Sequence, residues 1–107
     1  MPFIDVKASC EITRDQEERI KAGLGQAIAL IPGKAESHLM LRLTDRCRMW
    51  YAGEQDGPIV MTSVAILGET DQASFQQFGA AAVSLLQQEL AAKHVYLKLH
   101  QTSDWAF

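Results

Sequence analysis

Pro2 is the residue whose type and position could do the most chemistry in this chain. Methionine aminopeptidases generally remove Met1 before a small residue, so we expect the mature chain to begin with the secondary amine of proline. An α-amino group titrates near about 7.7–8.0, and both desolvation and a neighbouring cation lower that pKa because they disfavour the charged form. An amine poised near neutral pH can move protons as a general base. The alternative is that Pro2 only begins an edge strand, where a missing N–H matters little.

Length and composition predict a single compact domain over residues 1–107. The chain has 107 residues of which 48% are hydrophobic, which leaves no room for a second core. Its net charge of −3, from charged residues of mixed sign, argues against a nucleic-acid or membrane-surface protein. No segment reads as a secretory signal or a membrane span, so we expect a cytoplasmic location.

The two cysteines, Cys10 and Cys47, form no C-x-x-C pattern and so predict no metal site. Free thiols in a reducing compartment are the default expectation, and a disulfide between Cys10 and Cys47 is the lesser alternative. No cofactor is expected.

The chain repeats itself once without a gap. At a constant offset that places Pro58 in the position of Pro2, nine positions are identical between residues 2–50 and 58–106. In this alignment His38 matches His94, Leu41 matches Leu97 and Leu43 matches Leu99. A shared local structure is the economical explanation for this register.

Each half is predicted to fold as strand, helix, strand. Thr13-x-x-Gln16 is a capping-box pattern that opens the first helix, and Pro32-Gly33 ends it. Thr70 or Asp71 caps the second helix. Because a parallel strand pair needs a helical crossover, we expect an α+β fold: a duplicated β-α-β unit whose four-stranded mixed sheet carries two helices on one face.

The closing strands 38–44 and 94–100 alternate apolar and polar residues, as half-buried strands do. A short extra strand is expected at 48–52, followed by a loop at 53–57. The sheet face away from the helices would be too apolar to stay solvated and too charged to be a dry core; it would carry Phe3, Ile59, Met61, Met40 and Tyr96 beside Asp5, Lys7, Arg42 and Lys98. An oligomer that encloses this face would resolve the conflict.

These residues resemble the macrophage migration inhibitory factor branch of the tautomerase superfamily across essentially the whole chain. The resemblance rests on Met1-Pro2-Phe3-Ile4, the duplicated β-α-β unit, Pro32-Gly33-Lys34, Ile66-Leu67-Gly68 and Val95-Tyr96. It implies a homotrimer with three active sites at subunit interfaces, and keto–enol tautomerisation of aryl α-keto acids such as phenylpyruvate.

The resemblance also implies roles for individual residues. Pro2 would be the catalytic base, Lys34 would bind the substrate carboxylate and depress the proline pKa, and the backbone N–H of Leu67 would contact the substrate. The neighbouring subunit would contribute Tyr96. The remaining pocket residues would be His38, Trp105 and Phe107.

Each assignment has a structural alternative. Lys34 follows a helix end, where a cation is favoured anyway. Tyr96 could be an ordinary interface aromatic, and His38 a lining or surface residue. Leu67 could serve only as a core side chain. Trp105 and Phe107 could instead pack as a hydrophobic cover over one end of the domain.

The chain departs from the family pattern at several positions. Lys98 stands where asparagine is usual, which adds a second cation near the expected pocket mouth. Ile59 and Thr62 replace the C-x-x-C associated with thiol-disulfide activity, so that activity is not expected. The chain also ends at Phe107, earlier than mammalian relatives.

Two other functions compete with the enzyme. One is a cytokine-like signalling or binding protein that keeps the fold, is exported without a signal peptide and engages a host receptor. The other is a small ligand-binding module built on the same duplication, with no chemistry. The enzyme needs an unblocked Pro2 and a pocket cation, whereas a signalling protein needs neither.

Overall fold

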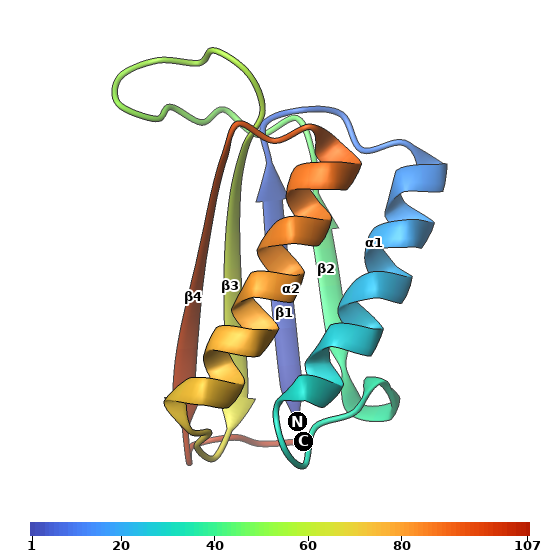
Figure 1. Cartoon of the computed structure of the whole chain (residues 1–107), viewed down its shortest axis with the longest axis vertical. Coiled ribbons are helices and arrows are strands. Elements are labelled where there is room, and N and C mark those ends of the chain that lie inside the picture. The colour runs from blue at the N-terminus through green and yellow to red at the C-terminus, as the bar shows by residue number, and fades with distance from the viewer.

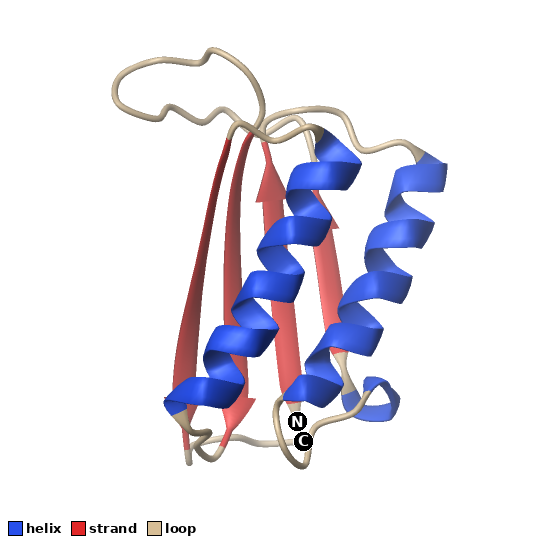
Figure 2. Ribbon diagram, viewed as in Figure 1, coloured by secondary structure: helices blue, strands red, loops and turns tan.

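The sheet draws two strands from each half of the chain. The elements, in chain order, are β1 (Pro2–Ala8), α1 (Arg14–Ala27), two 3₁₀ turns (Ile28–Leu30 and Glu36–His38), β2 (Met40–Thr44), β3 (Ile59–Leu67), α2 (Gln72–Leu90) and β4 (His94–Thr102). The computed structural model describes all residues 1–107. The strand order is β2-β1-β3-β4, and both helices cover one face of the sheet (Figures 1 and 2).

The two β-α-β units meet at the centre of this sheet. β1 pairs in parallel with β2, and β3 pairs in parallel with β4, so each helix is a crossover between parallel strands. The central pair, β1 and β3, is antiparallel. The predicted four-stranded mixed sheet with two helices on one face is confirmed.

Local capping sets where the helices begin. The Thr13 side chain accepts a hydrogen bond from the Gln16 N–H, and the Gln16 side chain accepts one from the Thr13 N–H, so the predicted capping box is formed. Asp71, rather than Thr70, caps α2 by accepting from the Ser74 N–H. These bonds satisfy amide groups that the first helical turn leaves without partners.

The core lies between the helices and the sheet face that they cover. Alternate residues of β1 and β3 point into it, including Ile4, Val6, Val64 and Ile66, all nearly inaccessible to solvent. Phe78 is the largest fully buried side chain and comes from α2. This period-two burial is what a half-buried strand requires, and it places the intervening residues on the open face.

The open face is both apolar and charged, as predicted. The strand register places Phe3 beside Met40, Asp5 beside Arg42, and Met61 beside Tyr96. Met40 is 69% exposed and Tyr96 is 60% exposed. At its centre Asp5, only 7% exposed, accepts hydrogen bonds from Arg42 and from Lys7.

The Asp5 ion pairs predict a measurable acid response. The Arg42 hydrogen bond lowers the pKa of Asp5 to about 2 against the opposing effect of burial, with Lys7 contributing further lowering. Because the folded pKa lies below the unfolded value of about 3.9, the stabilisation is complete above that value. It disappears as the pH falls through the folded pKa.

Asp5→Asn should therefore lower the free energy of unfolding at neutral pH by about 2 kcal/mol. The difference from the wild type should close as the pH falls from about 4 to about 2. Urea denaturation at fixed protein concentration across this range measures it, with the exposed Asp104→Asn variant as the control. A difference that does not change with pH would contradict the assignment of this effect to the Asp5 carboxylate.

The segment predicted as a strand at 48–52 is not a strand in the folded chain. It forms one isolated bridge, between Tyr51 and Glu54, and a turn. The prediction was wrong for a single chain because no strand of the sheet pairs with this segment through a ladder of main-chain hydrogen bonds. Neither helix has the length and apolar character needed to span a bilayer.

Candidate active site

Pro2 lies where β1 begins and β3 ends. It is buried and pairs with Ile66, the residue before Leu67 at the end of β3. The Leu67 N–H donates to the Met1 carbonyl oxygen at 3.1 Å. The chain's first peptide group is therefore held against the end of β3 by a main-chain hydrogen bond.

The Lys34 side chain also reaches the end of β3. The 3₁₀ turn after α1 is followed by Pro32 and by Gly33, whose φ of 81° is a left-handed value that favours glycine. The Lys34 N–H closes this turn on the Ile31 carbonyl at 3.0 Å. The Lys34 Nζ then donates to the Leu67 carbonyl oxygen at 2.7 Å. The structure thus brings Pro2, Lys34 and Leu67 together from three separate segments.

The electrostatics at this end of β1 favour a neutral amine. Burial lowers the pKa of the Met1 amino group below its usual value of 8.0, and the charge and hydrogen bond of Lys34 lower it further. Both causes disfavour the protonated form. A terminal amine one residue later in the chain, on Pro2, would lie beside the same lysine.

The other residues predicted around this end of the sheet are more loosely placed. His38 is exposed and lies two residues before Met40, which pairs with Phe3. Trp105 is half-buried, and Phe107 is 90% exposed. They follow the end of β4, and the two chain termini lie at the same end of the molecule in Figure 1.

Tyr96 and Lys98 do not reach this site within one chain. Ile66, the partner of Pro2, pairs with Gln101 of β4. Tyr96 lies five residues before Gln101, a distance of about 16 Å along a strand, and Lys98 lies about 10 Å along it. A site that contains Pro2 and Tyr96 together therefore requires a second copy of the chain.

An aromatic cluster that sequence reasoning missed surrounds Tyr96. The Tyr51 ring stacks on His94 with centroids 3.7 Å apart and meets Tyr96 edge-on at 5.8 Å. A hydrogen bond with Tyr51 raises the pKa of Tyr96. The sequence offered one sign of this cluster, which is that His94 and Tyr96 occupy alternate positions of one strand. The position of Tyr51 could not be predicted, because it belongs to the segment between the two halves of the chain.

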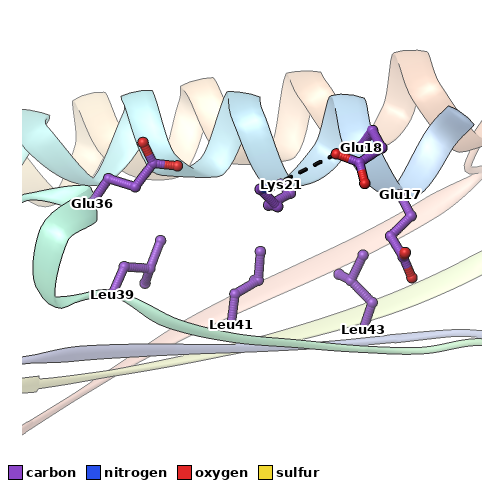
Figure 3. Close-up of a pocket in the computed structure, with 7 residues that line it drawn as sticks. All are labelled: Glu17, Glu18, Lys21, Glu36, Leu39, Leu41 and Leu43. Carbon is purple, nitrogen blue, oxygen red and sulfur yellow. Dashed lines mark ion pairs between the residues drawn. The ribbon is translucent and has the colours of Figure 1, made fainter. Parts of the chain in front are cut away.

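A groove of about 440 Å³ lies elsewhere, between α1 and the sheet edge (Figure 3). Three leucines of the β2 segment form its floor: Leu39, Leu41 and Leu43. Its rim carries Glu17, Glu18 and Glu36 against the single cation of Lys21, which pairs with Glu18. This excess of carboxylates repels an anion, so the groove does not suit a keto acid.

No group of three or more His, Cys, Asp or Glu side chains is arranged to hold a metal ion. Cys10 and Cys47 are both free thiols, and burial raises the pKa of the Cys10 thiol.

No protein-family model and no curated protein sequence matches the chain. Several solved structures are similar to the chain. MIF2 of Leishmania major superposes with a TM-score of 0.90 at 17% identity, covering 100% of this chain and 93% of the other. The chain has the macrophage migration inhibitory factor fold.

Two further structures with this fold support the assignment. The macrophage migration inhibitory factor-like protein of Entamoeba histolytica gives a TM-score of 0.85 at 14% identity, covering 99% of this chain and 94% of its own. Pt0534, solved after inactivation by 2-oxo-3-pentynoate, gives 0.81 at 12% identity, covering 98% and 91%. At these identities the likeness establishes the macrophage migration inhibitory factor fold, while the site residues depend on this chain's own geometry.

Proposed function

We propose that the chain is a tautomerase-superfamily enzyme that interconverts the keto and enol forms of aryl α-keto acids such as phenylpyruvate. The observation that carries the proposal is the meeting of Pro2, Lys34 and Leu67 at one end of the sheet. The keto acid named for the Pt0534 structure is in keeping with this substrate class.

In the proposed reaction the Pro2 nitrogen takes the proton from the carbon next to the keto group. The electron pair of that C–H bond becomes the C=C bond of the enol, and the protonated Pro2 nitrogen delivers the same proton to the former carbonyl oxygen. The same nitrogen returns the proton in the reverse direction. The reaction is an isomerisation, so atoms and electrons balance without a cofactor.

Lys34 has two tasks in this proposal. Its ammonium group pairs with the substrate carboxylate through a charge-assisted hydrogen bond, and its charge keeps the Pro2 amine neutral. The Leu67 N–H, which donates to the Met1 carbonyl while Met1 is present, becomes free to bind a substrate oxygen once Met1 is removed.

The rest of the pocket is proposed to form between subunits of a homotrimer. Tyr96 and Lys98 would come from a neighbour, because neither reaches Pro2 of its own chain. His38, Trp105 and Phe107 would complete the apolar wall. The segment 48–52, which pairs with no strand of its own chain, would find a sheet edge on another copy.

The test of this function is turnover by chains of defined N-terminus. Intact mass spectrometry separates chains that begin at Pro2 from chains that keep Met1. Purified Pro2-starting protein should tautomerise phenylpyruvate, and Met1-retaining protein should not, because its Pro2 nitrogen is an amide. An inactive Pro2-starting chain would leave the cytokine-like binding protein as the better account.

The trimer predicts a mass of about three times the 11.9 kDa of one chain. Light scattering at micromolar concentration should report it. Met40→Glu places a carboxylate on the open face, where Met40 is 69% exposed in a single chain, so it should disrupt the assembly while sparing the protomer's fold. Gln77→Glu, on the exposed side of α2, adds the same charge and should remain trimeric. A wild-type monomer throughout the range would exclude both the assembly and a shared site.

A further inference from the structure

Three sulfur-bearing side chains line one hollow at the end of the sheet opposite Pro2. The hollow has a volume of about 400 Å³ and is lined by Cys10, Cys47 and Met49, among others. Cys10 lies two residues after Ala8, the last residue of β1, whereas Pro2 begins that strand. The hollow is therefore separate from the proposed tautomerase site by the length of β1.

Main-chain hydrogen bonds hold the two cysteine segments side by side. The Cys47 N–H donates to the Ala8 carbonyl, and the Arg46 N–H donates to the Cys10 carbonyl, both at 2.9 Å. Both thiols are half-buried and neither is in a disulfide. The backbone thus fixes the relative position of two free thiols that are far apart in the sequence.

The burial pattern places Met49 on the same side as Cys47. From residue 45 to residue 50 half-buried and exposed residues alternate: Cys47 and Met49 are half-buried, and Arg46, Arg48 and Trp50 are exposed. Alternate residues of an extended segment share one side. Cys47 and Met49 both line the hollow that Cys10 lines, and Met49 also borders a second hollow beside Met61.

This donor set suits a soft ion of low coordination number. Thiolate and thioether sulfur favour Cu(I), whereas structural Zn²⁺ sites take four ligands from Cys, His, Asp or Glu. No third such residue joins the two cysteines. The Cys47 thiol is held by weak hydrogen bonds to the main-chain carbonyls of Thr44 and Asp45, at 3.7 and 3.8 Å.

We propose that the chain binds one Cu(I) ion in this hollow, through the thiolates of Cys10 and Cys47 and the thioether of Met49. Each thiol gives up its proton to solvent as its sulfur bonds the ion. Two protons are released and no electron is transferred. The site takes a soft monovalent metal and needs neither Pro2 nor a keto acid. Its test is therefore independent of the proposed tautomerase function.

The test is an anaerobic titration of the full chain with Cu(I) in competition with bicinchoninate. We expect one tightly bound ion per chain and an ultraviolet thiolate-to-copper charge-transfer band. Cys10→Ser and Cys47→Ser should each weaken binding by more than about 10-fold and abolish the band. Met49→Leu should keep the band and weaken binding less. Met40→Leu is the matched control and should bind like the wild type, because Met40 is an exposed methionine of β2 that lines neither this hollow nor the one beside Met61.

Two results would overturn the site: cysteine variants that bind Cu(I) as tightly as the wild type, or Zn²⁺ held more tightly than Cu(I). If a serine variant fails to fold by circular dichroism, the wild type supplies the same test through iodoacetamide. Bound Cu(I) should protect both thiols from alkylation together. Alkylation of either thiol at the metal-free rate in the presence of Cu(I) would equally exclude the site.

Discussion

Pro2→Gly should lower the tautomerisation of phenylpyruvate by about 10²–10⁴-fold, the usual contribution of a general base. Glycine is also small, so Met1 should still be removed and a terminal amine should remain. That amine is primary and lacks the rigid ring that fixes the proline nitrogen at the start of β1. The measurement is the initial rate on purified protein whose N-terminus has been confirmed by mass spectrometry.

Pro58→Gly is the matched control for this experiment. Pro58 occupies the corresponding position of the second repeat and precedes β3, at the opposite end of the sheet from Pro2. The same substitution there should leave turnover near the wild-type rate. If the Pro2→Gly protein is correctly assembled and fully active, Pro2 is not the base.

Lys34→Ala should reduce kcat/KM for phenylpyruvate by about 10- to 100-fold, which corresponds to the loss of one hydrogen bond to a charged group. It should also change the pH dependence. Lys34 lowers the pKa of the terminal amine at this site, so its removal should raise the pKa of the Pro2 amine. Because the neutral amine is the active form, the acid limb of the pH–rate profile should move to higher pH.

Lys21→Ala controls for the general loss of a positive charge, since Lys21 is an exposed cation on α1 whose only ion pair is with Glu18. Its profile should match that of the wild type. If Lys34→Ala retains both its turnover and its acid limb, Lys34 serves only as a cation after a helix end.

The repeating architecture was predictable from the sequence because its signals are local. The capping box at Thr13 and Gln16 lies within one helical turn. The helix end expected at Pro32-Gly33 was placed too late, because α1 ends at Ala27 and a 3₁₀ turn, Ile28–Leu30, follows it. The alternation of Leu41 and Leu43 with polar neighbours identifies a strand and the face that it buries. None of these signals depends on which segment packs against which.

The prediction of a strand at residues 48–52 failed because the segment has no strand to pair with. Residues 48–52 look like a short strand in the sequence, but a strand exists only when another strand accepts its hydrogen bonds. The only bridge there joins Tyr51 to Glu54 within the same loop. The helix cap at Asp71 was likewise open between two adjacent candidates until the structure showed which side chain accepts the Ser74 N–H.

The sequence by itself determined the elements, the open face of the sheet and, through resemblance, the residues to examine. Only the tertiary structure decided which of them meet: Lys34 with Leu67 beside Pro2, and Cys10 with Cys47 around one hollow. The same structure separates Tyr96 from Pro2 by most of a strand's length. The physical reason is that periodicity and capping act over one or two turns of chain, whereas these meetings are set by strand order and register across the whole sheet.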